Sequence, residues 1–261
     1  MLVRSIALRT ALDIHRAYGL VEDKGDHIVV RTPDLPDYWY GNCLAMPSPP
    51  RDGDLVPWLE LYEKELPGAR HRVFLVDGVD GGLGEFGSFI ERGFEASVRD
   101  VLTTDAPRAP ERLETELEYR PFSSDADWAA GVETSLAVNA GSPGYDPDYV
   151  ARSFAATRRA VTKGAGEWWG AWDGRRCAAQ MGLFGDGRTA RFKDVETHPE
   201  YRRRGVCRTL LYRLCGRWAA SRGPATFVIS PDDDDVRRVY EAVGFRYRER
   251  VADLCLRPPA A

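Results

Sequence analysis

The chain has 261 residues, a length that fits one large domain or two small ones. Its apolar and charged fractions, 43% and 29%, are those of an ordinary globular protein. The formal net charge is -4 and no stretch reaches the roughly 20 apolar residues that span a bilayer, so we expect neither nucleic acid nor a membrane as a partner.

The cysteines and histidines are scattered along the chain. The five cysteines are an odd number and no CxxC occurs, which argues against a disulfide framework and against a structural zinc site. The four histidines show no spacing typical of metal ligands. We therefore expect no metal, and we expect most cysteines to be small buried side chains in a reducing, cytoplasmic compartment.

The first 110 residues alternate predicted helices and short strands. Residues 1–20 carry three arginines among apolar residues and no apolar secretion segment, so an amphipathic helix is favoured over an organellar transit peptide. Asp54 is placed to begin a helix whose apolar residues recur every three or four positions. Strands are predicted at residues 27–31, 38–46, 72–76 and 94–102, and a further helix at residues 85–92.

Residues 103–110 form the predicted linker, because they hold two threonines and two prolines without an apolar repeat. The pattern then restarts, which predicts domains at residues 1–110 and 116–261. The second domain is expected to be α/β (α+β), a mixed sheet with helices on both faces. Its predicted strands are residues 117–122, 167–172, 176–184, 187–197, 225–229 and 246–256, its helices residues 125–140, 148–161, 205–221 and 234–242, and its first long loop residues 141–147.

The most informative segment is residues 195–211, VETHPEYRRRGVCRTLL. A strand leads into Pro199, a basic loop follows, and a helix is predicted to begin near Gly205. The first N–H groups of a helix are unpaired and carry partial positive charge, so such an end binds phosphate readily. A solvated loop is the alternative for the three arginines alone, but the order of strand, proline, basic loop, glycine and helix favours a phosphate site.

This segment resembles the pyrophosphate-binding motif of the GNAT superfamily of N-acetyltransferases, a strand followed by Arg/Gln-x-x-Gly-x-Gly/Ala and a helix. Arg202, Gly205 and Cys207 occupy the three motif positions, with cysteine in place of the usual glycine or alanine. Residues 240–245, YEAVGF, are similar to the run that closes the last helix of that superfamily. The resemblance covers about residues 117–256 and implies a GNAT-like fold.

The two halves of the chain end in a similar way. The first ends in helix, Gly93, Phe94 and strand, and the second in helix, Gly244, Phe245 and strand. This echo predicts a tandem protein whose N-terminal lobe is a degenerate GNAT-like lobe. The lobe lacks a basic phosphate loop, so we expect it to bind no CoA and to supply acceptor-pocket wall or an interface.

The resemblance implies that acetyl-CoA, or another short acyl-CoA, is the acyl donor. Backbone groups of Val195 and Thr197 would bond its pantetheine amides, and the backbone N–H groups of residues 203–208 would hold its pyrophosphate. The implied cofactor-binding residues are Val195, Thr197, Arg202, Arg203, Arg204, Gly205, Val206, Cys207 and Arg208.

Two catalytic residues are expected. Tyr240 lies where the superfamily often places a general acid for the CoA thiolate, and a core aromatic is the alternative. An alkylamine has a pKa near ~10, so a group must accept its proton at neutral pH. Glu196 or Asp194 could serve, with a solvent-facing carboxylate as the alternative for each, while His198 is disfavoured. The backbone N–H of Val195 is the expected oxyanion donor.

Two conspicuous groups of residues have structural explanations. Residues 232–235 are four aspartates that open a predicted helix, where caps and dipole partners explain them. Trp168 and Trp172 would share one face of a strand, so core packing is expected, with the lining of a substrate pocket as the alternative.

Two functions remain open from the sequence. The first is an N-acetyltransferase that acts on a primary amine of a small molecule or peptide. The second is a non-catalytic acyl-CoA-binding module that regulates or pairs with a partner. Tyr240 favours the enzyme. The sequence does not name the acceptor amine, and it leaves a homodimer open.

Overall fold

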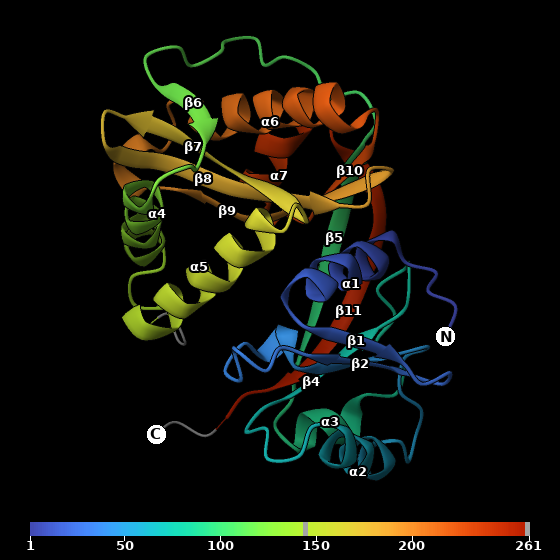
Figure 1. Cartoon of the computed structure of the whole chain (residues 1–261). Helices are drawn as coiled ribbons and strands as arrows, with labels where there is room; N and C mark the ends of the chain where they lie inside the picture. Colours follow the sequence, from blue (N-terminus) through green and yellow to red (C-terminus); the bar gives the residue numbers. More distant parts are fainter. Residues whose placement is uncertain (143–145, 259–261) are drawn as a thin grey trace. The chain divides into compact units, whose positions relative to one another are not determined.

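The computed structural model describes residues 1–142 and 146–258 (Figure 1). Contacts along the chain divide it into two units. Unit 1 contains Met1–Val101 together with the chain from Arg248 onward, and unit 2 is Leu102–Tyr247. The middle of the loop predicted at residues 141–147 lies outside the described residues.

Unit 1 is built on a sheet with the strand order β1-β2-β3-β4-β11-β5. Neighbouring strands β3 and β4 are parallel and are connected through α2, whereas β11 runs antiparallel to β4. The elements are α1 (Ile6–Tyr18), β1 (Leu20–Asp23), β2 (Ile28–Arg31), η1 (Trp39–Gly41), β3 (Cys43–Met46), α2 (Leu55–Glu65), β4 (Arg72–Val76), α3 (Gly87–Glu91), β5 (Glu95–Thr104) and β11 (Arg246–Leu256).

Alternation along the strands gives unit 1 a core on each face of its sheet. Ile28 and Val30 pack with α1, and Val29 packs with α2 and α3 on the opposite face. Since successive side chains of a strand point to opposite faces, a short run of apolar residues is buried throughout. Figure 1 shows α1 on one side of these strands and α2 with α3 on the other.

Unit 2 contains the end of β5 and the strand order β5-β10-β9-β8-β7-β6. The neighbours β9 and β10 are parallel, whereas β5 with β10, β8 with β9, β7 with β8 and β6 with β7 are antiparallel. The elements are β6 (Glu118–Pro121), α4 (Asp125–Val138), α5 (Pro147–Thr162), β7 (Gly166–Asp173), β8 (Arg176–Gly185), β9 (Thr189–Thr197), η2 (Pro199–Tyr201), α6 (Val206–Arg222), β10 (Thr226–Ile229) and α7 (Asp234–Glu241).

Local capping explains where the helices of unit 2 begin. The Ser124 side chain accepts from Asp127 N and the Asp127 side chain accepts from the Ser124 backbone, which is a capping box. Asp146 caps α5 by accepting from Tyr149 N, and Pro147 occupies the first helical position. These caps satisfy N–H groups that would otherwise have no partner.

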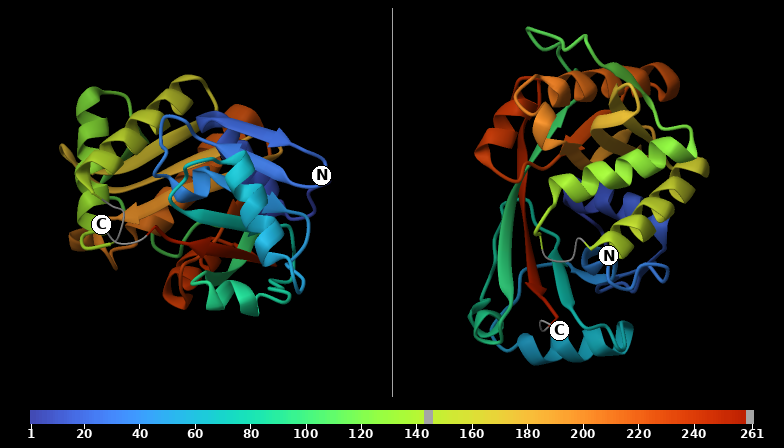
Figure 2. Two further views of the ribbon diagram at one scale, coloured as in Figure 1. Left: turned by 90° about the horizontal axis from the view of Figure 1, so that it is seen from below. Right: turned by 90° about the vertical axis from the view of Figure 1, so that its left-hand side faces the viewer.

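Helices cover both faces of the unit 2 sheet: α4 and α5 lie on one face of β7–β9 and α6 lies on the other (Figures 1 and 2). On the α6 face, Leu210, Leu214 and Trp218 are fully buried. On the α4 face, aromatic side chains pack in edge-to-face and tilted pairs, and both Trp168 and Trp172 belong to this core. The expected packing role of these two tryptophans is confirmed.

The structure differs from the sequence-based expectations in three segments. Residues 39–41 form a 3-10 turn, so the strand predicted at residues 38–46 is shorter. The strand β1 was not expected. Thr103 and Thr104, placed in the linker, extend β5 and pair with Val228 and Phe227 of β10. β-branched threonine suits a strand, and its partner is distant in sequence. The domain limits 1–110 and 116–261 stay a prediction.

Candidate active site

The site begins where two parallel strands part. β9 and β10 pair over three positions, the last being Arg191 with Val228. β9 then continues to Thr197, whereas β10 ends at Ile229. Within the described residues, the carboxyl-terminal part of β9 therefore pairs with β8 alone, and its other edge is open to a ligand.

A β-bulge interrupts β9 at this edge. Gly182 of β8 pairs with Lys193 and Gln180 pairs with Glu196, so two residues of β9 lie opposite one of β8. Asp194 has a φ of 49°, a left-handed conformation that is uncommon for a residue other than glycine. A bulge leaves its extra residue outside the ladder, and Val195, which follows Asp194, lines the pocket at the opening between the strands.

The loop after β9 turns backbone N–H groups toward the same opening. Arg203 and Gly205 have φ values of 61° and 83°, and Gly205 precedes α6 without a side-chain cap. Left-handed residues beside a helix start gather successive N–H groups into a concave anion site. The first N–H groups of α6 have no intrahelical partner, and the helix dipole adds partial positive charge.

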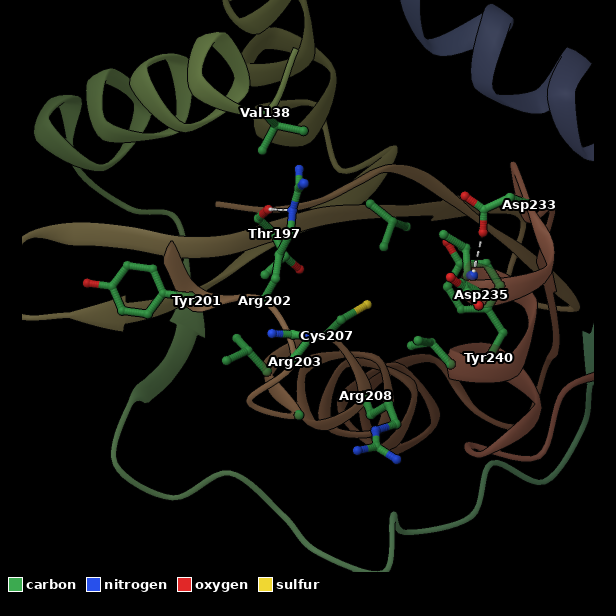
Figure 3. Close-up of a pocket in the computed structure, with 15 residues that line it drawn as sticks. Val138, Thr197, Tyr201, Arg202, Arg203, Cys207, Arg208, Asp233, Asp235 and Tyr240 are labelled. Carbon is green, nitrogen blue, oxygen red and sulfur yellow. Dashed lines mark hydrogen bonds between the residues drawn. The ribbon is translucent and has the colours of Figure 1, made fainter. Parts of the chain in front are cut away.

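A pocket of about 580 Å³ lies against this helix start. Arg203 and Arg208 line it, and neither forms an ion pair with any residue that the structure describes. Figure 3 shows Cys207 directing its sulfur into the pocket and Arg202 extending toward Val138 of α4. The lining residues are Val138, Val195, Thr197, Tyr201, Arg202, Arg203, Gly205, Val206, Cys207, Arg208, Asp233, Asp235, Val236, Val239 and Tyr240.

Arg204 takes a different direction from its neighbours. Its Nη2 donates to Glu116 Oε2 at 3.1 Å, and its guanidinium lies 5.2 Å from the centre of the Tyr201 ring. The Tyr201 hydroxyl donates to Asp173 Oδ2 at 2.8 Å. The side chain of Arg204 is thus outside the pocket lining, and any contact with a cofactor through its backbone stays a prediction.

Tyr240 lies on α7 and borders the pocket. Its side chain is 4% exposed and packs against Phe245 of the core. Burial raises the pKa of the phenol well above its ordinary value, so the hydroxyl keeps its proton throughout the neutral range. This hydroxyl has no hydrogen-bond partner within residues 1–142 and 146–258, so its proton is available to a ligand.

Glu196 lies beside the pocket rather than in its lining. Its carboxyl faces α4, accepts three side-chain hydrogen bonds and is 8% exposed. Burial, and then the charge of Asp194, raise the pKa of Glu196 to about 7. Asp194 itself is exposed and pairs with Lys193, so the two carboxylates proposed as alternatives have different surroundings.

The remaining polar candidates have structural partners. Asp233 caps α7 by accepting from Val236 N at 2.7 Å, and Asp235 pairs with Arg238. Capping is therefore confirmed for Asp233, although both aspartates also border the pocket. His198 accepts from Glu200 N at 3.4 Å at the start of η2.

Several neighbours of the site carried no signal in the sequence. Val138 and Asn139 end α4, Gln180 lies in β8, and Val236 lies in α7. None belongs to the two quoted motifs. They meet only because the sheet places β8 and β9 side by side under α4, which the residues alone do not reveal.

Unit 1 repeats the order of these elements without the basic loop. The elements β3, α2, β4, α3 and β5 follow one another as β9, α6, β10, α7 and β11 do, and each set begins with a parallel pair joined by a helix. Before α2, Asp52 N donates to Glu85 Oε2 at 2.6 Å and Arg51 N donates to Asp54 Oδ2 at 2.7 Å. Carboxylates of the chain thus take two N–H groups of the loop before α2, although α2, like α6, has no side-chain cap.

The short helices α3 and α7 also end alike. Phe94 N donates to Phe89 O at 2.9 Å, and Phe245 N donates to Tyr240 O at 3.3 Å. A glycine precedes each of these phenylalanines, with φ values of 98° and 99°, as in a Schellman motif. Phe89 therefore holds in unit 1 the place that Tyr240 holds in unit 2, with the ring but without the hydroxyl.

No helix within residues 1–142 and 146–258 is both long enough and apolar enough to cross a bilayer. The same residues contain no group of three or more histidine, cysteine, aspartate or glutamate side chains placed to hold a metal ion.

The chain is similar to one protein family and to several solved structures. Residues 135–245 match the Acetyltransferase (GNAT) family. This match contains β9, the basic loop, α6 and α7, and therefore the whole helix start described above. No curated protein matches the chain.

Solved structures are similar along most of the chain. A GCN5-related N-acetyltransferase from Kribbella flavida is 16% identical with a TM-score of 0.63, covering 98% of this chain and 97% of that one. A conserved protein of unknown function from Staphylococcus epidermidis ATCC 12228 is 14% identical with a TM-score of 0.70, covering 91% and 93%. A tandem GNAT protein from the clavulanic acid biosynthesis pathway is 12% identical with a TM-score of 0.52, covering 77% and 68%. These similarities show a shared mixed α/β fold.

Proposed function

We propose, from the premise that the C-terminal half of this chain belongs to the GNAT family of acyl-CoA-dependent acyltransferases, that the protein is an N-acetyltransferase. The proposed reaction moves an acetyl or other short acyl group from acyl-CoA to a primary amine of a small molecule or peptide. The five cysteines are free, four of them buried, which supports a reducing compartment such as the cytoplasm.

The observation that carries the proposal is the start of α6. It has no side-chain cap, it opens on a pocket of about 580 Å³, and the guanidinium groups of Arg203 and Arg208 there have no carboxylate partner in the described chain. Arg203 is exposed and Arg208 half-buried, so both can bring positive charge to a ligand at this helix start without first breaking an ion pair. A pyrophosphate supplies both the charge and the acceptor oxygens that this helix start lacks.

The free edge of β9 fits the rest of an acyl-CoA molecule. Val195 and Thr197 line the pocket beyond the last pairing of β9 with β10. Their backbone groups would bond the pantetheine amides as an added strand does. Cys207 is small enough to leave this path open, and it stands where the family motif has glycine or alanine.

Three groups of the chain would serve the reaction, for which bound acyl-CoA supplies the activated acyl group. The Val195 N–H, displaced by the bulge, would stabilise negative charge on the carbonyl oxygen. Tyr240 would donate its proton to the sulfur as the carbon–sulfur bond breaks. Glu196 would accept the proton of the amine as the carbon–nitrogen bond forms, because a carboxyl with a pKa of about 7 is partly ionised at neutral pH.

We also propose that unit 1 is a degenerate GNAT-like lobe that binds no acyl-CoA. The repeated order of elements supports the relationship. The carboxylates of Asp54 and Glu85 at the start of α2, and Phe89 in the place of Tyr240, support the loss of cofactor binding and of the acid.

Turnover of acetyl-CoA against a panel of primary amines, followed by release of the free thiol, tests the proposed function. We expect release that depends on one class of amine. If calorimetry detects acetyl-CoA binding while no amine accelerates thiol release, the chain is an acyl-CoA-binding module rather than an enzyme.

A further inference from the structure

The carboxyl group of Glu196 is held by side chains of two other elements. Its Oε1 accepts from Ser135 Oγ and from Asn139 Nδ2, each at 2.9 Å. Its Oε2 accepts from Gln180 Nε2 at 2.7 Å. Ser135 lies in α4, Asn139 is the residue that caps the end of that helix, and Gln180 lies in β8. The carboxyl therefore has one defined orientation relative to α4 and to the sheet.

The donors are themselves fixed. Gln180 Nε2 also donates to Gly131 O at 2.8 Å, and Gln180 Oε1 accepts from Trp168 Nε1 at 3.3 Å. Asn139 Nδ2 also donates to Ser135 O at 3.0 Å. A side chain with several partners cannot rotate without breaking more than one hydrogen bond, so the donors hold the Glu196 carboxyl rigidly.

The number of hydrogen bonds identifies the atom that remains open. An ionised carboxylate has about four acceptor positions, two on each oxygen. Both positions of Oε1 are taken by Ser135 and Asn139, and one position of Oε2 is taken by Gln180. One position remains, and it belongs to Oε2 of Glu196.

The same end of α4 also forms a wall of the acyl-CoA pocket. Val138 lines the pocket, and Asn139, the next residue, holds Glu196. Figure 3 shows Val138 above the loop that carries Arg202. The position of the carboxyl relative to the pocket is therefore set by α4.

We propose that Ser135, Asn139 and Gln180 are positioning residues that hold Glu196 so that its Oε2 accepts the proton of the attacking amine, directly or through one water molecule. In this step the amine loses its proton to Oε2, the new carbon–nitrogen bond forms, and the thiolate that leaves takes a proton from Tyr240. The proposal rests on the proposed function, and it adds the residues that position Glu196 and lower its pKa.

The charges around Glu196 set the direction of the expected effects. On β9 the Asp194 carboxylate disfavours ionisation, and on β8 the Cys177 thiol, whose pKa burial raises to about 12, is neutral. From α4 and its C-cap, the neutral donors Ser135 and Asn139 face the carboxyl. Hydrogen bonds to the ionised form lower the pKa of Glu196, so removal of one donor raises that pKa further.

The test is the pH dependence of kcat/KM for the amine at saturating acetyl-CoA. Asn139→Leu removes one donor and keeps the branching of the side chain at Cγ, and Ser135→Ala removes the other donor to the same oxygen without changing the helix end. Thr134→Val is the matched control, because the Thr134 hydroxyl is buried in the same helix but donates to Cys177 O at 2.8 Å.

We expect the acidic limb of the profile to move upward by about one pH unit in Asn139→Leu and in Ser135→Ala. The rate at pH 7 should fall about fivefold, since the ionised fraction falls from about one half to about one tenth, while the KM for acetyl-CoA stays within about twofold. Thr134→Val should keep the profile of the parent. A limb that stays in place in both donor variants would overturn the proposal.

A further variant separates this proposal from the function on which it rests. Glu196→Gln keeps the size of the side chain and removes the titrating group. If the wild-type chain acetylates an amine and Glu196→Gln does so at full rate, the proton goes elsewhere and this proposal alone fails. If the wild-type chain acetylates no amine, the proposed function fails first.

Discussion

Replacing Glu196 with glutamine should change how the stability of the protein depends on pH. The ordinary pKa of a glutamate is 4.5, and burial raises that of Glu196 to about 7 in the folded chain. Between these two values the folded state holds a proton that the unfolded state has lost. The free energy of unfolding contributed by this group is therefore fully present below pH 4.5 and is lost as the pH rises through 7.

The size of this effect follows from the two pKa values. At about 1.36 kcal/mol for each pH unit, the interval from 4.5 to about 7 corresponds to about 3 kcal/mol. Most of it, roughly 2 to 3 kcal/mol, is lost between pH 5 and pH 8. Glu196→Gln has no such proton, so its stability should fall by roughly 2 to 3 kcal/mol less than that of the wild type over this interval.

Urea unfolding at pH 5 and pH 8, followed by tryptophan fluorescence, measures this difference. Five of the seven tryptophans lie in unit 2, the unit that contains Glu196. They are Trp128, Trp168, Trp169, Trp172 and Trp218. Glutamine also places a donor opposite the amide of Gln180, which costs stability equally at both pH values and cancels in the comparison. Parallel pH dependence in the two proteins would refute the raised pKa of Glu196.

Three further predictions concern the pocket. Tyr240→Phe keeps the ring and its packing, so it should lower kcat by ~10²–10⁴-fold in single-turnover assays and leave the Kd of acetyl-CoA unchanged; a rate within twofold of the parent would make Tyr240 a core aromatic. Calorimetric titration of the whole chain should give one acetyl-CoA per chain, because the loop before α2 in unit 1 has no run of arginines and its Arg51 and Asp52 N–H groups already donate to carboxylates; a stoichiometry of two would contradict this. Cys207→Ala should keep the Kd within about threefold whereas Cys207→Trp should abolish binding by filling the pocket, and equal Kd values for both variants would place the Cys207 side chain away from the cofactor.

The helices of unit 2 and the adjacent antiparallel strands β7 and β8 were predictable from the sequence because their signals are local. Ser124 caps α4 three residues before its partner, and Gly244 ends the turn after α7. The strand partners of the end of β5 and of the end of β11 were not predictable. Thr103 pairs with a strand more than a hundred residues later, and the end of β11 pairs with β4 in unit 1. Periodicity identifies a strand but does not name its neighbour.

The phosphate-binding half of the candidate site was also predictable, because strand, loop and helix start are continuous in sequence. Nine of the eleven expected site residues border one pocket, and the exceptions are Arg204 and Glu196. Which way Arg204 turns depends on Glu116, which no motif contains. The bulge at Asp194 contains no glycine that would have predicted its left-handed conformation. The surroundings of Glu196 depend on three elements that meet only in the folded sheet.

The central claim is that acyl-CoA binds at the start of α6 through its phosphates, and charge reversal tests it most directly. Arg203 borders the pocket without an ion-pair partner in the described chain, whereas Arg204, next to it, is paired with Glu116 outside the lining. Calorimetric titration of acetyl-CoA should therefore show a Kd at least tenfold weaker in Arg203→Glu, about 1.4 kcal/mol, and a smaller change in Arg204→Glu. An unchanged Kd in Arg203→Glu would remove this helix start from the site.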